Sequence, residues 1–256
     1  EKLPAVTPTL TQLFINRVEA TPSREAFRAP TDDGAWVSTT WKETGEDVNN
    51  LAAGLIALDI ELEQRVGIAA ETSLEWVLAD LAIAVAGGAA TTVYASTGAE
   101  DVAYILSDSH TRLLFAQDEA QVAKVRQKRS ELGDLRKIIL MKGEPVAEDG
   151  DWVITMNDLR ELGKEKLKAE PDVVKNRSAQ VTAELLATLI YTSGTTGRPK
   201  GVELTQGNWG YIGAGLDGLD VIHVDDVQFL WLPLAHVFGS VLIATQLQIG
   251  FVTAVD

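Results

Sequence analysis

Apolar residues recur along the chain in two patterns, one typical of helices and one typical of strands. Val48, Leu51, Leu55 and Leu58 are spaced by three, four and three residues, so they lie on one face of a predicted helix. Other short runs are apolar at nearly every position, as in strands that are buried on both faces of a sheet. These predicted strands are residues 65–70, 89–94, 112–116, 137–141, 185–191, 227–232 and 251–255. Their alternation with helical segments predicts an α/β fold: a layered, mainly parallel sheet with helices on both faces.

The predicted helices have recognisable starts. Four threonines stand three residues before a Glu or Gln, which is the spacing of a capping box, where each side chain bonds the other residue's backbone N–H. The pairs are Thr9 with Gln12, Thr40 with Glu43, Thr72 with Glu75, and Thr97 with Glu100. We expect a helix to begin after each of these threonines.

Two longer stretches need separate interpretation. The apolar stretch 76–94 contains Asp80 and two adjacent glycines, so it predicts a buried helix followed by a strand and no membrane-spanning segment. The charged stretch 142–175 predicts a surface excursion with one amphipathic helix around residues 156–167. The basic run 124–129 is bracketed by acidic residues and is interpreted as a solvated helix face.

Composition narrows the possible functions. The 256 residues are 46% hydrophobic and 23% charged, as in an ordinary globular protein. With 22 Lys and Arg against 37 Asp and Glu, the net charge of −15 repels a phosphate backbone, so no nucleic-acid partner is expected. The sequence has no cysteine, which excludes disulfides, thiolate metal sites and a cysteine nucleophile. Because its start shows no signal-peptide pattern, the chain is expected to be cytoplasmic.

One segment carries candidate chemistry: residues 189–201, LIYTSGTTGRPKG, in which an apolar strand runs into a polar loop. Its glycines let backbone N–H groups approach a ligand closely, and its hydroxyl groups add movable donors. Lys200 adds a full positive charge, so the loop has the donors that a polyphosphate needs. The glycines are Gly194, Gly197 and Gly201, and the hydroxyl residues are Thr192, Ser193, Thr195 and Thr196.

The loop differs from the common nucleotide-binding P-loop, in which four residues separate a glycine from a Gly-Lys-Ser/Thr group. Here Gly194 and Gly197 are three residues apart, and Gly201 follows Lys200 where the P-loop has Ser or Thr. The sequence therefore disfavours a P-loop nucleoside triphosphatase. A Gly- and Thr-rich surface turn without a ligand is the structural alternative.

Residues 191–201, YTSGTTGRPKG, resemble the phosphate-loop signature of the adenylate-forming enzymes, which include acyl-CoA synthetases, adenylation domains of peptide synthetases and luciferases. Residues 232–239, LPLAHVFG, are similar to the segment that lines the acyl site in this family. Together with KGVELTQGNW, EWVLADLAIAVAGGAATTVYAS and EDVAYILSDS, these segments most resemble bacterial long-chain fatty acyl-CoA synthetases. The resemblance extends over nearly the whole chain.

Members of this family activate a carboxylate with ATP to form acyl-AMP and pyrophosphate, and the thiol of CoA then displaces AMP. The resemblance implies ATP, Mg²⁺ and CoA as cofactors, with the CoA site outside this chain, and a fatty acid as substrate. It implies that residues 192–201 hold the β- and γ-phosphates, with Lys200 catalytic and the Thr192 hydroxyl assisting Mg²⁺. It also places His236 as a catalytic residue beside the acyl carboxylate, with Phe238 and Gly239 in the substrate site.

Parts of the family pattern differ or lie outside the sequence. Many relatives have Leu-Thr-His where this chain has Leu204-Thr205-Gln206, and some carry an aromatic acyl gate where Gly239-Ser240 stand. A metal-binding glutamate, a ribose-binding aspartate and a mobile C-terminal domain with a catalytic lysine are expected later than residue 256. The chain is therefore expected to be an incomplete N-terminal domain of an adenylate-forming enzyme, inactive by itself.

Within this AMP-binding domain, residues 1–60 are expected to form N-terminal helices and a hairpin. Residues 61–222 are the predicted first α/β subdomain, which ends in the phosphate loop and its helix, and residues 223–256 begin the second. An apolar strand edge within residues 227–256 favours self-association into a homo-oligomer. His110 and His223 have no motif around them and are interpreted as structural.

Two other interpretations stay open. The same fold could serve as a non-catalytic module that binds a nucleotide or a partner protein. The chain could also belong to another adenylating branch, one that activates amino acids or aryl acids. Only the LPLAHVFG segment argues against that branch, because the residues that set acyl specificity are expected mostly after the end of this sequence.

Overall fold

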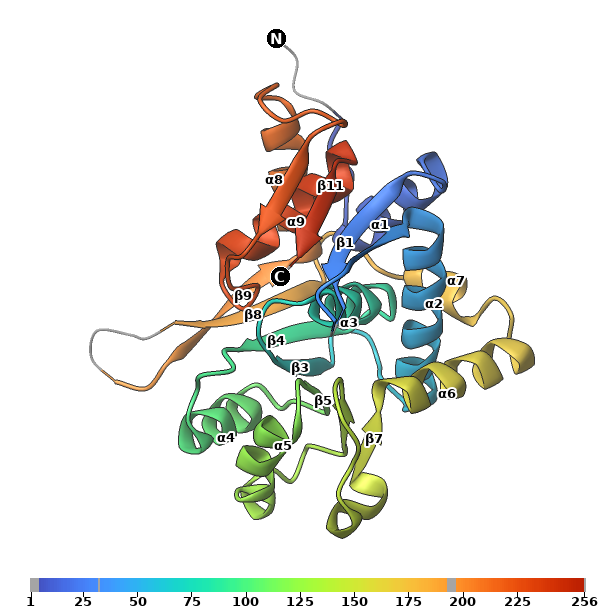
Figure 1. Cartoon of the computed structure of the whole chain (residues 1–256). Helices are drawn as coiled ribbons and strands as arrows, with labels where there is room; N and C mark the ends of the chain where they lie inside the picture. Colours follow the sequence, from blue (N-terminus) through green and yellow to red (C-terminus); the bar gives the residue numbers. More distant parts are fainter. Residues whose placement is uncertain (1–4, 32, 193–196, 256) are drawn as a thin grey trace.

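The computed structural model describes residues 5–31, 33–192 and 197–255, and their strands form two sheets (Figure 1). The larger sheet has seven strands in the order β7-β6-β5-β3-β4-β8-β9. All neighbouring strands in it are parallel except β8 and β9. These strands are β3 (Arg65–Ala69), β4 (Ala89–Val93), β5 (Leu113–Ala116), β6 (Lys137–Leu140), β7 (Val153–Thr155), β8 (Leu186–Thr192) and β9 (Lys200–Thr205). The predicted α/β fold with a mainly parallel sheet is confirmed.

The smaller sheet combines segments that are far apart in the sequence. Its strands are β1 (Glu25–Pro30), β2 (Trp36–Thr40), β10 (Val227–Leu230) and β11 (Val252–Val255), in the order β10-β11-β1-β2. Strand β11 is parallel to both β10 and β1, whereas β1 and β2 form an antiparallel hairpin. An early hairpin and two late strands therefore share one sheet (Figure 1). The domain boundaries near residues 60 and 222 stay a prediction.

Helices cover both faces of the larger sheet (Figure 1). Helices α4 (Ala99–Asp108) and α5 (Glu119–Arg126) cover one face, while α2 (Trp41–Ala57) and α3 (Leu74–Val85) cover the other. Every residue of α3 from Trp76 to Val85 is buried, which confirms the buried helix that leads into β4. The other helical segments are α1 (Leu10–Ala20), α6 (Met156–Ala169), α7 (Val173–Ser178), α8 (Gln206–Asp217), α9 (Val237–Ile249) and the 3-10 segments η1 (Arg129–Glu131) and η2 (Ala147–Trp152).

Two of the four predicted helix caps are confirmed. The Glu43 N–H donates to the Thr40 hydroxyl over 3.2 Å, and the Glu43 carboxylate accepts from the Thr40 N–H over 2.8 Å. This reciprocal pair starts α2. At α1, the Thr9 hydroxyl accepts a hydrogen bond from the Gln12 N–H over 2.9 Å.

The other two predicted caps are wrong. Helix α3 is capped by Ser73, because the Thr72 hydroxyl is bonded to a distant loop instead. Helix α4 begins after Gly98 without a side-chain cap, and Thr97 lies in a turn that its N–H closes on the Tyr94 carbonyl. The predicted amphipathic helix of the charged stretch is confirmed as α6. In the described part of the chain, no helix has the length and apolarity needed to cross a bilayer.

Candidate functional site

The segment predicted to bind phosphate forms the antiparallel hairpin β8–β9, which extends outward from the larger sheet (Figure 1). The sequence predicts one continuous loop from Thr192 to Gly201, and this is wrong at both ends. Thr192 is the last residue of β8, and Lys200 and Gly201 are the first residues of β9. Thr192 pairs with Lys200, and Tyr191 pairs with Gly201. Ladder pairing of β9 with β8 fixes the backbone at Lys200.

The middle of the loop lies partly outside the described residues. Ser193, Gly194, Thr195 and Thr196 belong to that gap, so their predicted phosphate contacts stay predictions. Thr192, Gly197 and Lys200 are exposed. The ammonium group of Lys200 therefore stands at the solvent-accessible base of the loop, where it can approach an anion.

The second predicted site segment lies between β10 and α9. His236 is the N-terminal cap of α9, and its Nδ1 accepts a hydrogen bond from the Phe238 N–H over 3.2 Å. Because Nδ1 accepts, the neutral ring carries its proton on Nε2, which is free to donate to a ligand. The side chains of His236 and Phe238 are exposed, whereas Gly239 is buried. A Cβ at Gly239 would lie 2.6 Å from the Pro233 carbonyl oxygen, so Gly239 closes this turn.

Two threonines at the carboxyl ends of strands hold this loop in place. The Thr72 hydroxyl, just after β3, donates to the Leu232 carbonyl over 2.7 Å and accepts from the Leu234 N–H over 3.1 Å. The Thr92 hydroxyl, on β4, donates to the Ala235 carbonyl over 3.1 Å. The loop that leads to His236 is thereby fixed at one edge of the larger sheet.

Thr92 also connects the phosphate-loop hairpin to the loop of His236. Thr92 pairs with Ile190 of β8, two residues before Thr192, and it bonds Ala235, one residue before His236. The phosphate-loop hairpin and the histidine loop therefore leave the same edge of the sheet. In open α/β sheets, ligands bind at the carboxyl ends of the strands.

A cavity of about 370 Å³ lies at this edge. It is lined by residues after β3 and β4, including Thr72 and Tyr94, and by Trp231, Leu234 and Ala235 of the histidine loop. Its volume is within the range of small-molecule pockets. Neither Lys200 nor His236 lines it.

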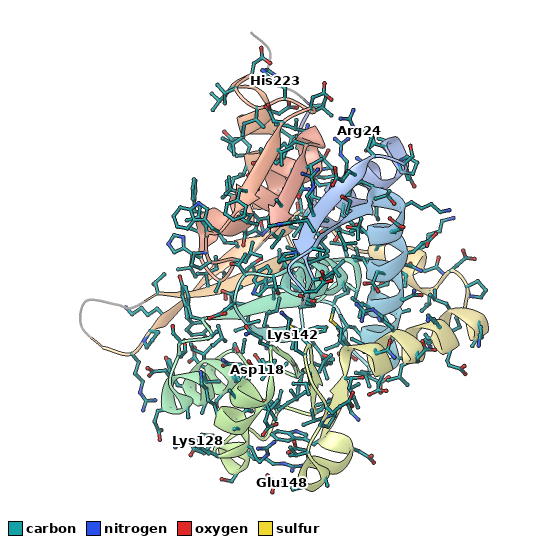
Figure 2. All side chains as sticks on the ribbon, in the orientation of Figure 1. Arg24, Asp118, Lys128, Lys142, Glu148 and His223 are labelled. Atoms are coloured by element: carbon teal, nitrogen blue, oxygen red, sulfur yellow. The ribbon has the colours of Figure 1, made fainter. Side chains whose placement is uncertain are left out.

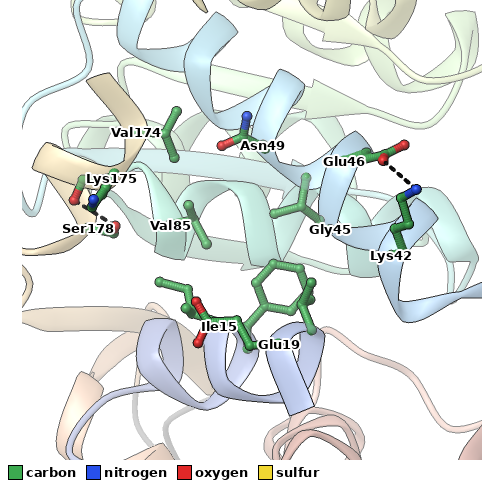
Figure 3. Close-up of a pocket in the computed structure, with 13 residues that line it drawn as sticks. Ile15, Glu19, Lys42, Gly45, Glu46, Asn49, Val85, Val174, Lys175 and Ser178 are labelled. Carbon is green, nitrogen blue, oxygen red and sulfur yellow. Dashed lines mark hydrogen bonds and ion pairs between the residues drawn. The ribbon is translucent and has the colours of Figure 1, made fainter. Parts of the chain in front are cut away.

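A larger cavity, of about 470 Å³, lies elsewhere, among α1, α2 and α7. Figure 3 shows its apolar wall, which includes Ile15, Val85 and Val174, and the charged residues Lys42 and Glu46 at its rim. It contains none of the residues that the sequence predicts to bind phosphate or substrate.

The two other histidines and the basic run that the sequence singled out contact carboxylate groups. His110 Nδ1 lies 2.8 Å from an Asp134 carboxylate oxygen. His223 Nδ1 lies 3.7 Å from an Asp220 carboxylate oxygen, at the opposite end of the molecule from Glu148 (Figure 2). In the basic run, the Arg126 guanidinium contacts Asp149 over 2.7 Å, and this carboxylate raises the pKa of Arg126.

The described residues include no cluster of three or more His, Cys, Asp or Glu side chains that could hold a metal ion. Mg²⁺ is commonly bound by one or two protein oxygens together with substrate phosphates. The exposed hydroxyl of Thr192 is suited to that limited role.

Sequence reasoning missed Thr72 and Thr92 as residues that position the site. The first was assigned to a helix cap, and the second is one more small residue in a buried strand. The carbonyl groups to which they donate belong to Leu232 and Ala235, which are 160 and 143 residues away in the sequence. A threonine at the carboxyl end of a parallel strand was the available signal.

The mainly parallel sheet with helices on both faces is the fold found in solved CoA ligases, of which this chain matches about half. The structure of the anthranilate CoA ligase AuaEII in complex with anthranoyl-AMP matches with a TM-score of 0.83 at 21% identity, over 99% of this chain and 46% of that chain. The long-chain-fatty-acid-CoA ligase FadD1 from Archaeoglobus fulgidus matches with a TM-score of 0.80 at 18% identity, over 100% of this chain and 48% of that chain.

The chain belongs to the AMP-binding enzyme family, whose family model matches residues 14–255. It is 32% identical over 212 residues to the long-chain-fatty-acid–CoA ligase FadD15 of Mycobacterium tuberculosis, covering 82% of this chain and 34% of that protein. It is 30% identical over 238 residues to the long-chain-fatty-acid–CoA ligase ACSBG2 of Xenopus laevis, covering 91% and 32%. The chain thus spans about a third of the length of these curated relatives.

Proposed function

We propose that this chain supplies the ATP phosphate site and part of the acyl site of a cytoplasmic long-chain-fatty-acid–CoA ligase. The observation that carries the proposal is the connection through Thr92, which joins the hairpin of Lys200 to the loop of His236 at one sheet edge. The relatives named as long-chain-fatty-acid–CoA ligases support the acyl substrate class. Because the chain spans about a third of their length, we propose that it does not complete the reaction alone.

In the proposed reaction, a carboxylate oxygen of the fatty acid attacks the α-phosphorus of ATP. The bond from the α-phosphorus to the oxygen that bridges to the β-phosphate breaks, and pyrophosphate leaves. The thiol of CoA then attacks the acyl carbonyl carbon, its proton passes to solvent, and AMP leaves with the electron pair of the broken bond. Mg²⁺, where bound, would neutralise part of the phosphate charge, with the Thr192 hydroxyl as its candidate protein ligand.

Two side chains of this chain have proposed roles in these steps. Lys200, exposed at the start of β9, would stabilise the negative charge that grows on the departing pyrophosphate. His236 would direct its Nε2–H toward the carboxylate or the adenylate, because its Nδ1 is engaged by the Phe238 N–H.

Titration of the chain with MgATP tests the phosphate site. A charged hydrogen-bond donor contributes roughly 1.5–3 kcal/mol, so Lys200→Ala is expected to weaken binding by about ten- to a hundredfold. Lys168→Ala is the matched control, since it removes the same charge from an exposed position on α6. No binding by the parent chain, or equal binding by the two variants, would contradict the proposal.

A further inference from the structure

The hairpin that carries the phosphate loop is bonded to helix α4 on both of its strands. The Tyr191 hydroxyl, from β8, donates to the Asp108 carboxylate over 2.7 Å. The Tyr104 hydroxyl donates to the Pro199 carbonyl, next to β9, over 3.2 Å. Asp108 and Tyr104 are one helical turn apart on α4, so one face of this helix contacts both sides of the loop base.

Aromatic contacts reinforce these hydrogen bonds. The rings of Tyr104 and Tyr191 meet edge to face, with centroids 6.4 Å apart and planes at 85°. The guanidinium carbon of Arg198 lies 4.9 Å from the centroid of the Tyr104 ring, within cation–π distance. Burial is the larger cause, and the hydrogen bond to Asp108 the second, of a pKa of Tyr191 well above its usual range. The Tyr191 hydroxyl is therefore protonated at neutral pH and can donate.

Gly201 contributes to this arrangement because it has no side chain. A Cβ at Gly201 would lie 3.2 Å from Cζ of Tyr191, which is tighter than ordinary van der Waals contact. The glycine therefore leaves room for the Tyr191 ring beside the backbone that follows Lys200. The sequence pattern suggested phosphate contact for Gly201, and ring packing supplies a separate reason for a glycine there.

Strand β9 is the outer strand of the larger sheet, paired on one side with β8. Its residues Lys200 to Glu203 are exposed, so few packing contacts hold this part of the strand. The contacts with α4 flank Lys200 directly, at Pro199 and at the Tyr191 ring beside Gly201. They are the described contacts that tie this end of the hairpin to the body of the domain.

We propose that α4 is a positioning element for the phosphate loop, in which Asp108 and Tyr104 fix the hairpin so that Lys200 meets a polyphosphate. The proposal rests on the proposed function, because it assumes that Lys200 binds phosphate. Asp108 and Tyr104 would not touch the ligand. They would restrict the backbone at Lys200 before the ligand binds, so that less conformational entropy is lost on binding.

The test measures MgATP affinity and thermal unfolding for Asp108→Ala, Tyr191→Phe and the double variant of the chain. Each single change is expected to weaken MgATP binding by roughly three- to tenfold, and the double variant should be no weaker than either single one. Asp108→Asn, which keeps an acceptor oxygen, should restore most of the affinity. Tyr211→Phe, on the exposed side of α8, is the control and should bind like the parent.

Amide hydrogen exchange of the ligand-free variants gives a second readout, and exchange in β9 should rise while that in β3 and β4 stays unchanged. If the parent binds MgATP and both single variants bind it as tightly as the parent does, the positioning role is overturned. An unchanged exchange rate in β9 would overturn it as well. A parent chain that binds no MgATP would instead overturn the proposed function, and this role of α4 with it.

Discussion

At the scale of single residues, Asp80 is a carboxyl group whose ionisation is strongly altered by burial. It lies on α3, where every residue from Trp76 to Val85 is buried. Burial alone raises the pKa of Asp80 from 3.8 to about 7. In the unfolded chain the carboxyl ionises near its ordinary value, so the folded state binds its proton more tightly than the unfolded state does.

This difference predicts how stability depends on pH. Between about pH 4 and pH 7 the unfolded chain loses the proton while the folded chain keeps it, so the free energy of unfolding falls as pH rises. Above pH 7 the loss is complete and is on the order of 4 kcal/mol. Asp80→Asn should therefore stabilise the protein at pH 8 and change little at pH 4, as measured by urea unfolding.

The control is Asp101→Asn, because Asp101 is exposed on α4. It should leave the pH dependence between 4 and 7 as it is in the parent chain. An Asp80→Asn variant that loses stability over this range as steeply as the parent would show that Asp80 is ionised in the folded protein.

At the scale of elements, helices α2 and α6 cross at backbone contact. A Cβ at Gly163 would lie 1.8 Å from the Asn50 carbonyl oxygen, and a Cβ at Gly54 would lie 2.3 Å from the Leu159 carbonyl oxygen. The Asp47 carboxylate accepts from the Arg160 guanidinium over 2.6 and 2.9 Å beside this crossing. The two glycines therefore set the distance between the helices.

Gly163→Ala is expected to destabilise the protein by roughly 1–3 kcal/mol or more, since the added methyl group must displace backbone. Gly215→Ala is the matched control in helix α8, where a Cβ would meet nothing within 4 Å. There the better helix propensity of alanine should stabilise by roughly 0.5–1 kcal/mol. Chemical denaturation measures both, and equal effects of the two substitutions would refute the close crossing.

The elements also show what the sequence could predict. Strand β8 was predictable because its run is apolar throughout. Strand β9 has no such pattern, and its first two residues, Lys200 and Gly201, were assigned to a loop. Thr72 has the spacing of a helix cap, but its hydroxyl bonds the Leu232 carbonyl, and sequence spacing contains no information on that competition. The parallel pairing of β1 with β11 depends on contacts more than 200 residues apart in the chain, such as Phe27 with Thr253.

At the scale of the whole molecule, an exposed apolar region lies on strand β10, an outer strand of the smaller sheet, and on the residue that follows it. Val227 is 55% exposed, Phe229 54% and Trp231 67%. By contrast Phe251 and most of β11 are buried, because β11 lies between β10 and β1. Of the apolar edge that the sequence predicts within residues 227–256, residues 251–255 are therefore not part, and the exposed edge is confined to β10 and the residue after it.

Large exposed aromatic side chains beside an outer strand favour association between copies of a chain. The predicted homo-oligomer should therefore form through this edge, and its mass should rise with protein concentration in light scattering. Trp231→Lys should shift the chain toward monomer, whereas Tyr211→Lys, at a side chain exposed to a similar degree on α8, should not. A parent chain that stays monomeric over a hundredfold dilution series would contradict this prediction.

The central claim is that the β8–β9 hairpin and the histidine loop form one nucleotide site. Amide hydrogen exchange with and without MgATP tests it most directly, because it reports each segment separately. Added MgATP should protect residues 186–205 and 231–239 together and leave α7 unchanged. At the same MgATP concentration, Lys200→Ala should lower the protection of both segments. Protection of the residues around the cavity among α1, α2 and α7, with none at the hairpin or the histidine loop, would contradict it.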